Sequence, residues 1–212
     1  MHVNVMDCTL RDGSYSINFG FTGEDTANIC SALEAAGFRY LEIGHGIGLG
    51  ANERTHTRAA ATDLEYCRAG RDSLTEAKYG MFAIPGIATL DDVEMAADHG
   101  MGFIRVGTDV TDVAQSEPFI AAALRRGMLV ATNIMKSYTI APAAFAQLVK
   151  QSESYGSQLA YVVDSAGCMS PEDVVEYYRA IREVSDIPVG FHGHDNLGMA
   201  VYNSLRMADE GA

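Results

Sequence analysis

The strongest constraint in this sequence is a repeated alternation between two kinds of segment. Seven times along 212 residues, a short apolar run typical of a β-strand precedes a stretch with helical spacing of apolar residues. The predicted strands are Val3–Cys8, Tyr40–Gly44, Gly80–Ile84, Phe103–Val106, Met128–Asn133, Leu159–Asp164 and Pro188–His192. The predicted helices are Glu24–Ala36, Thr62–Thr75, Leu90–His99, Pro118–Arg126, Pro142–Tyr155, Pro171–Val184 and Asn196–Glu210.

This alternation predicts a parallel sheet whose strands are connected by helices. An open doubly wound sheet and a closed eight-stranded barrel both satisfy it. The first strand-to-helix turn, Leu10–Ser14, lacks the G-x-G-x-x-G pattern of a dinucleotide site. Polar residues follow most of the strands, and barrel enzymes build their sites from many such loops. We therefore expect an α/β fold of the TIM (β/α)-barrel type, with residues 1–212 as a single catalytic domain.

The number of strand–helix units is one short of a closed barrel. We count seven units, and the last predicted helix reaches the end of the sequence. A barrel that lacks one strand would expose two strand edges and part of its core. Either this chain is part of a longer protein, or another segment closes the gap. We expect the first, with a C-terminal βα unit lacking from this chain.

Charge and cysteine content limit the classes of partner. The formal net charge is −13, which disfavours nucleic acid, because phosphate binding needs clustered Lys and Arg. No apolar run approaches the roughly 20 residues of a membrane span. The four cysteines form no C-x-x-C pair, which argues against a zinc knuckle and a disulfide framework. We expect a cytoplasmic protein that binds neither nucleic acid nor membrane.

Two short segments carry the residue types that a metal site needs. Arg11 and Asp12 follow the first predicted strand, and His192 and His194 lie at the end of the last one. In an extended segment, residues i and i+2 point the same way, so both imidazoles can share one face. Asp12 can approach them across the mouth of a barrel. Two nitrogens and one carboxylate leave coordination positions open for water or substrate, and such an ion polarises a carbonyl group.

Several motifs together resemble one family. They occur in the family's order along essentially the whole chain: Thr9–Gly13, Ile43–Gly46 with Gly48, Thr62–Tyr66, Ile84–Ile87, Asp164–Ser170, and His192 with His194. The set is similar to the DRE-TIM metallolyase (HMGL-like) superfamily, and within it most similar to the 4-hydroxy-2-oxovalerate aldolases.

The resemblance implies a lyase that splits a 4-hydroxy-2-oxo acid into pyruvate and an aldehyde. It implies Asp12, His192 and His194 as ligands of a divalent metal, with Mn²⁺ expected first and Mg²⁺, Co²⁺ or Zn²⁺ as alternatives. It also implies Arg11 as the group that stabilises the metal-bound enolate of pyruvate, and Ser165 near the bound keto acid. Family aldolases often pair with an aldehyde dehydrogenase, so such a partner is expected, as is a homo-oligomer.

One position departs from the family pattern. The aldolases carry a catalytic histidine three residues after the metal-binding Asp, and this chain has Tyr15 there. A tyrosine has an ordinary pKa near 10 and is a poor base at neutral pH. Either Tyr15 acts as an acid or orienting group, or the proton moves elsewhere. His45, which also follows a strand, is the alternative base, and it can equally be a hydrogen-bonded structural histidine.

Two other functions remain open at this level. A Claisen-type acyl-CoA lyase or synthase would use the same scaffold and metal. A non-catalytic barrel that serves as a partner protein would explain the tyrosine in place of the base. Biotin-dependent carboxyltransferases share the scaffold but carry a lysine just before the residue that matches Asp164, where this chain has Val163.

Overall fold

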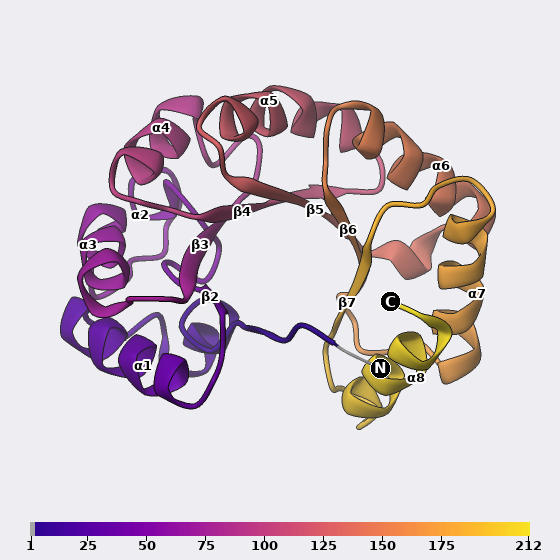
Figure 1. Cartoon of the computed structure of the whole chain (residues 1–212), viewed down its shortest axis with the longest axis horizontal. Coiled ribbons are helices and arrows are strands. Elements are labelled where there is room, and N and C mark those ends of the chain that lie inside the picture. Colours follow the sequence, from indigo (N-terminus) through magenta and orange to yellow (C-terminus); the bar gives the residue numbers. More distant parts are fainter. Residues whose placement is uncertain (1–2) are drawn as a thin grey trace. The chain divides into compact units, whose positions relative to one another are not determined.

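A computed structural model describes residues 3–212 and gives a regular succession of strands and helices. Seven parallel strands follow one another along the chain, each succeeded by at least one helix (Figure 1). The strands are β1 (Met6–Asp7), β2 (Tyr40–Glu42), β3 (Lys78–Ala83), β4 (Phe103–Asp109), β5 (Leu129–Met135), β6 (Leu159–Asp164) and β7 (Val189–Gly193).

The helices lie between these strands. The α-helices are α1 (Gly23–Ala35), α2 (Ala51–Arg54), α3 (Asp63–Ser73), α4 (Leu90–Asp98), α5 (Glu117–Arg125), α6 (Pro142–Ser154), α7 (Pro171–Arg182) and α8 (Ala200–Glu210). Three 3₁₀ helices, η1 (Asp12–Ile17), η2 (Val113–Ser116) and η3 (Ser137–Thr139), each start within a few residues of a strand's carboxyl end.

The chain forms two compact units, and the first, here called the N-terminal unit, comprises residues 4–106 and 121–129. In it β1 pairs with β2, β2 with β3, and β3 with β4, all in parallel. Helix α1 packs against α3, and α3 against α4. The apolar side chains between helices and strands are almost fully buried, among them Leu41, Ile43, Met81, Phe103 and Ile104.

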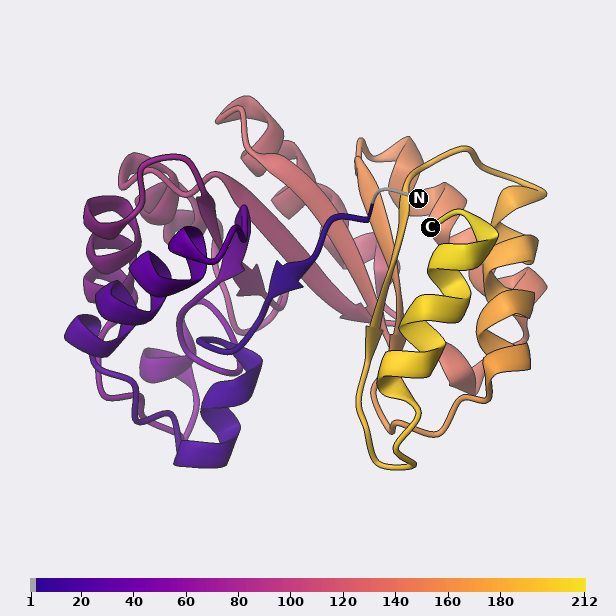
Figure 2. The same ribbon diagram turned by 60° about the horizontal axis from the view of Figure 1, so that its bottom comes forward.

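The second, here called the C-terminal unit, comprises residues 1–3, 107–120 and 130–212, of which residues 1 and 2 lie outside the described part. In it β5 pairs with β6 and β6 with β7. Helix α7 packs against both α6 and α8, and Figure 2 shows α8 beside α7. The unit has its own core of buried side chains, which includes Ile134, Phe145, Val162, Ile181 and Met207.

Four helices begin with the same local device. Each starts with a capping box, in which a Thr or Ser side chain accepts from the third helical N–H while an acidic side chain accepts from the cap's own N–H. The pairs are Thr22 with Asp25 at α1, Thr62 with Glu65 at α3, Thr89 with Asp92 at α4, and Ser170 with Asp173 at α7. These contacts fix where the helices begin after the strand-to-helix loops.

The structure confirms the expected fold class, α/β with seven parallel strands of the (β/α)-barrel kind. Several element boundaries differ from the prediction by a few residues. Strand β1 is limited to Met6–Asp7, and α8 begins at Ala200 instead of Asn196. The later start has a local cause, since Asp195 accepts a hydrogen bond from the Ala200 N–H and holds the preceding residues in a turn. The expectation of a single domain over residues 1–212 stays a prediction.

No helix within residues 3–212 combines the length and apolar character that crossing a bilayer requires.

Candidate active site

The segment after β1 positions Arg11 and Asp12 at the carboxyl end of that strand. The Cys8 carbonyl accepts hydrogen bonds from the N–H groups of Arg11 and Gly13, and η1 then begins at Asp12. The Asp12 carboxylate is half-buried and lies 3.4 Å from Nη1 of Arg11. The structure therefore brings these two predicted site residues together.

Arg11 is held in place by a buried carboxylate that the sequence analysis missed. Its Nε atom donates to Oε2 of Glu42 at 2.6 Å, and its guanidinium carbon lies 4.7 Å from the centre of the Phe82 ring. Nη1 also donates to the Gly46 carbonyl. Because the Glu42 carboxylate and the Phe82 ring already hold the guanidinium group, it loses little conformational freedom when it binds substrate.

Glu42 also accepts two hydrogen bonds from a second arginine, Arg105 on β4. Nε of Arg105 donates to Oε1 at 2.6 Å and Nη2 donates to Oε2, while neither side chain is more than 1% exposed. Burial alone would raise the pKa of Glu42, but Arg105 and Arg11 lower it to about 2. The carboxylate is therefore ionised at all ordinary pH values. Asp12 supplies a second carboxylate, beside the guanidinium group of Arg11.

A signal for this cluster was present in the sequence. Glu42 and Arg105 each interrupt an apolar strand, Tyr40–Ile43 and Phe103–Val106. A charge inside such a run is costly unless it is paired, so one acid and one base in two strand interiors indicate a buried ion pair.

Tyr15 lies on η1, three residues after Asp12, and 52% of its surface is exposed. Its ring meets Phe19 edge to face, with the ring centres 4.8 Å apart. Burial raises the pKa of Tyr15, and the nearby Arg11 charge only partly opposes this effect. The phenol is therefore protonated at neutral pH, which suits a donor or orienting group better than a base.

His45 follows β2 and is fully buried. Its Nδ1 accepts a hydrogen bond from the Ile47 N–H at 3.0 Å, its ring stacks on Phe19, and Nε2 lies 3.4 Å from the Thr57 hydroxyl. Burial lowers the pKa of His45, so the ring is neutral at pH 7. These contacts are those of a structural histidine. The role of His45 as an alternative base stays a prediction.

In the C-terminal unit, His192 and His194 lie at the carboxyl end of β7, as the strand pattern predicts. Their ring centres are 5.3 Å apart, with an angle of 65° between the planes. The His194 N–H donates to the Asp164 carbonyl at the end of β6, which fixes the segment that carries the second imidazole. The two rings can thus present nitrogen atoms to one ion.

The loop after β6 is built around the buried side chain of Asp164. Its carboxylate accepts from the N–H groups of Cys168 and Met169. Gly167 has φ +58°, and a Cβ atom there would meet the Asn196 nitrogen and the His194 carbonyl oxygen, each at 2.6 Å. Glycine is therefore required for the loops after β6 and β7 to lie this close.

Ser165, in this same loop, contacts the end of β5. Its hydroxyl accepts a hydrogen bond from the Lys136 N–H at 3.0 Å. Ser165 and the two histidines thus lie on neighbouring strand ends of the C-terminal unit. Asp12, Arg11, Tyr15 and His45 belong to the N-terminal unit.

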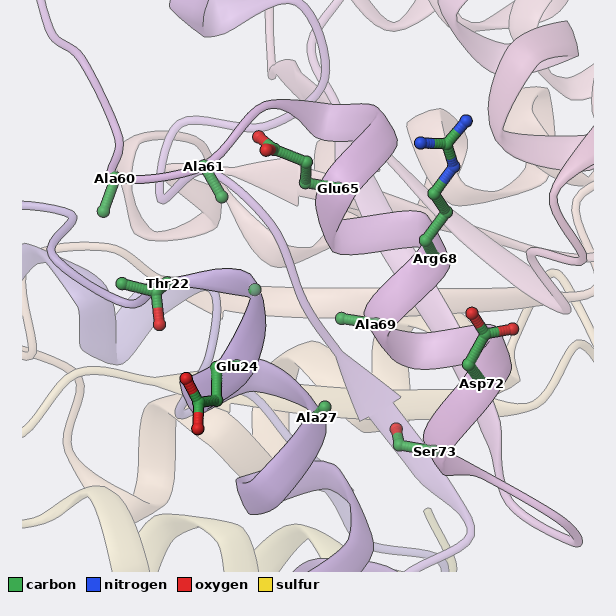
Figure 3. A pocket seen from close by; sticks show the side chains of 11 residues that line it. Thr22, Glu24, Ala27, Ala60, Ala61, Glu65, Arg68, Ala69, Asp72 and Ser73 are labelled. Atoms are coloured by element: carbon green, nitrogen blue, oxygen red, sulfur yellow. The ribbon is translucent and has the colours of Figure 1, made fainter.

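A groove of about 550 Å³ lies elsewhere, between α1 and α3 of the N-terminal unit (Figure 3). Its walls consist of small side chains such as Ala27 and Ala69, with charged groups such as Glu65 and Arg68 at its edge. None of the predicted site residues lines it, so we assign it no part in the chemistry.

Comparison with known proteins gives agreement over nearly the whole chain. The HMGL-like family matches residues 2–212. An oxaloacetate decarboxylase from Mycobacterium tuberculosis is 40% identical over 208 residues, which cover 98% of this chain and 61% of that protein. A 4-hydroxy-2-oxovalerate aldolase from Carboxydothermus hydrogenoformans is 39% identical over 210 residues, with 99% and 62% covered. The chain thus spans about three fifths of the length of these curated relatives.

Solved structures agree with the fold. The N-terminal domain of a candidate aldolase from Bacteroides vulgatus superposes with a TM-score of 0.82 at 25% identity, covering 99% of this chain and 70% of that one. A pyruvate carboxylase from Rhizobium etli superposes with a TM-score of 0.85 at 21% identity, covering 100% and 23%. The second likeness bears on the fold alone.

Proposed function

This chain belongs to the HMGL-like family, and from that premise we propose that it is a divalent-metal-dependent carbon–carbon lyase that cleaves a 4-hydroxy-2-oxo acid into pyruvate and an aldehyde. The observation that carries the proposal is the buried Arg11–Glu42 pair beside Asp12, in a chain that also places two histidines at the end of β7. A fixed guanidinium next to a metal-binding carboxylate is the arrangement that an enolate oxygen needs.

The donor set fits a divalent cation. Asp12 offers a carboxylate oxygen, and His192 and His194 each offer a ring nitrogen. Two nitrogens and one oxygen suit Mn²⁺, Mg²⁺, Co²⁺ or Zn²⁺, with positions left for a bidentate keto acid. Such an ion, when bound, would polarise the 2-oxo group of the substrate.

The remaining charge and proton movements fall to the protein's own groups. In the cleavage step, a base takes the proton of the 4-hydroxyl group, with His45 as the candidate. C4 becomes the aldehyde carbon, and the C3–C4 electron pair passes into the enolate of pyruvate. Arg11 is permanently charged and held by Glu42, so its free donors stabilise the developing enolate oxygen. The enolate then takes a proton at C3 to give pyruvate. Tyr15 is protonated and supplies or orients a proton near this centre.

A second reaction on the same site has specific support. The relative from Mycobacterium tuberculosis is an oxaloacetate decarboxylase. Loss of carbon dioxide from oxaloacetate produces the same pyruvate enolate, and it needs no base to deprotonate a hydroxyl group. A site with a protonated Tyr15 and a hydrogen-bonded His45 suits this reaction.

The test uses the polypeptide that carries this sequence, with Mn²⁺ added. Pyruvate release from a series of 4-hydroxy-2-oxo acids supports the aldolase, and release from oxaloacetate alone supports the decarboxylase. Activity should disappear with a chelator and in Asp12→Ala. Asp72→Ala is the matched control, because Asp72 is an exposed residue of α3 paired with its neighbour Arg71. Activity that persists in Asp12→Ala would contradict the proposal.

The proposed association with an aldehyde dehydrogenase, and the proposed homo-oligomer, rest on the family resemblance. Co-purification and the molar mass in solution test them.

A further inference from the structure

Lys136 has an unusual backbone conformation at the carboxyl end of β5. Its φ and ψ angles are 59° and 37°, in the left-handed region that disfavours a lysine by roughly 1–2 kcal/mol. The N–H of this residue donates to Ser165, and its carbonyl accepts from Thr139 at the end of η3. Hydrogen bonds of both the N–H and the carbonyl group therefore hold this strained conformation. Lys136 directly follows the last residue of β5.

The side chain of Lys136 forms an ion pair that does not explain the strain. Nζ lies 2.7 Å from Oδ2 of Asp109, the last residue of β4, and 52% of the lysine side chain is exposed. Exposed pairs of this kind contribute about 0–1 kcal/mol, because water screens them. The ion pair alone therefore does not offset the backbone cost, and a strained position of this kind is common at ligand-binding sites.

Lys136 is the sole Lys or Arg in the described loops at its edge of the C-terminal unit. The loops that follow β4, β5, β6 and β7 there comprise residues 110–112, 136–141, 165–170 and 194–199, all of them described. An ammonium group has three donors, and Asp109 engages one of them. The others are available to a ligand.

Two hydrogen bonds, made by the neighbouring residues Ser165 and Asp164, connect the backbone of this lysine to that of His194. Lys136 donates its N–H to Ser165, and the neighbouring Asp164 carbonyl accepts from the His194 N–H. A ligand at the end of β7 therefore lies two strands from a fixed cation, with the loop after β6 between them. That separation suits a substrate with negative charge at both ends.

We infer that Lys136 binds a second carboxylate of the substrate, so that the preferred substrates are 2-oxo acids with a carboxylate at the far end. This inference rests on the proposed function and specifies its substrate class. In the cleavage of such a dicarboxylic 4-hydroxy-2-oxo acid, the second carboxylate stays with the aldehyde fragment. The products are then pyruvate and an aldehyde acid.

The test measures binding and does not require turnover. Dissociation constants of the Mn²⁺-loaded protein are determined by calorimetry for 2-oxoglutarate and for 2-oxopentanoate, which has a methyl group in place of the second carboxylate. We expect 2-oxoglutarate to bind about tenfold more tightly, the size of effect that one charge-assisted hydrogen bond gives. Lys136→Asn, which tolerates the left-handed backbone, should bring the ratio of the two constants close to one, and Lys136→Arg should keep most of it.

Lys150→Asn is the matched control, because it removes the same charge from the exposed face of α6 and should keep the wild-type ratio. A wild-type ratio near one, or a Lys136→Asn ratio equal to the wild-type value, overturns the inference. Equal weakening of both ligands in Lys136→Asn also overturns it, because that result indicates a structural role. If neither oxo acid binds to the Mn²⁺-loaded protein, the proposed function fails together with it.

Discussion

Replacing Glu42 by Gln tests how the Arg11–Glu42–Arg105 cluster is stabilised. The pKa of Glu42 falls from an ordinary 4.5 to about 2 because two guanidinium groups outweigh the effect of burial. A lowering of that size corresponds to about 3 kcal/mol of folding free energy. The neutral amide of the Glu42→Gln variant would lose this stabilising free energy, and the two buried guanidinium groups would then face a group without charge. At pH 7, we therefore expect Glu42→Gln to lower the free energy of unfolding by about 3 kcal/mol.

The pH dependence identifies the cause of this loss. An acid whose pKa is lowered in the folded state contributes stability that is fully present above its unfolded pKa, here 4.5. That contribution is lost as the pH falls through the folded value of about 2. The curves for wild type and Glu42→Gln should thus lie apart above pH 5 and converge as the pH approaches about 2. Urea denaturation measures this, followed by far-ultraviolet circular dichroism because the chain has no tryptophan.

Glu34→Gln provides the comparison. Glu34 also has a pKa lowered to about 2, by hydrogen bonds from the N–H groups of Ala77, Glu76 and Thr75, but it is solvent-accessible. In Glu34→Gln, water can form hydrogen bonds with the N–H groups that the carboxylate no longer holds. This variant should therefore lose clearly less stability than Glu42→Gln. A constant difference between wild type and Glu42→Gln from pH 7 down to about 2 would refute the electrostatic account and indicate a packing defect instead.

The remaining predictions concern loops and helix starts. Gly167→Ala should weaken Mn²⁺ binding at least tenfold by calorimetry, since the added Cβ displaces the backbone at His194, and unchanged affinity would contradict the close packing described. Burial raises the pKa of Asp63 to about 6 although the Gly50 N–H donates to it, so its stability contribution is present below pH 3.8 and lost as the pH rises through about 6. Asp63→Asn should consequently be at least as stable as wild type at pH 7.5, and a loss there would refute this. Ser170→Ala removes the cap of α7 and should cost about 1 kcal/mol in urea denaturation.

The parts of the fold that depend on local pattern could be predicted from sequence. Strand and helix positions follow from the spacing of apolar residues, and the His192 and His194 rings approach each other because alternate residues of a strand share a face. Thr89 and Ser170 mark helix starts because their side chains bond to N–H groups three residues later.

Features that depend on residues far apart in the chain could not be predicted from the sequence. Glu42 and Arg105 each stand out as a charge inside an apolar strand, but they are 63 residues apart on strands that are not hydrogen-bonded to each other, so local pattern does not specify the geometry of their contact. The left-handed conformation of Lys136 is equally hidden, because a lysine has no local preference for it and the bond to Ser165 sustains it. The short helix η1 also escaped prediction, since Asp12–Ile17 has the composition of a loop.

The four capping boxes have a consequence for which anions the protein can hold. The exposed N–H groups at the start of a helix are a common binding place for phosphate, helped by the helix dipole. At α1, α3, α4 and α7, one of those N–H groups already bonds to a hydroxyl, and a carboxylate occupies the first turn. A phosphate ester at any of these four ends would find one donor fewer and would meet a like charge. These four helix starts are therefore unfavourable places for a phosphate group.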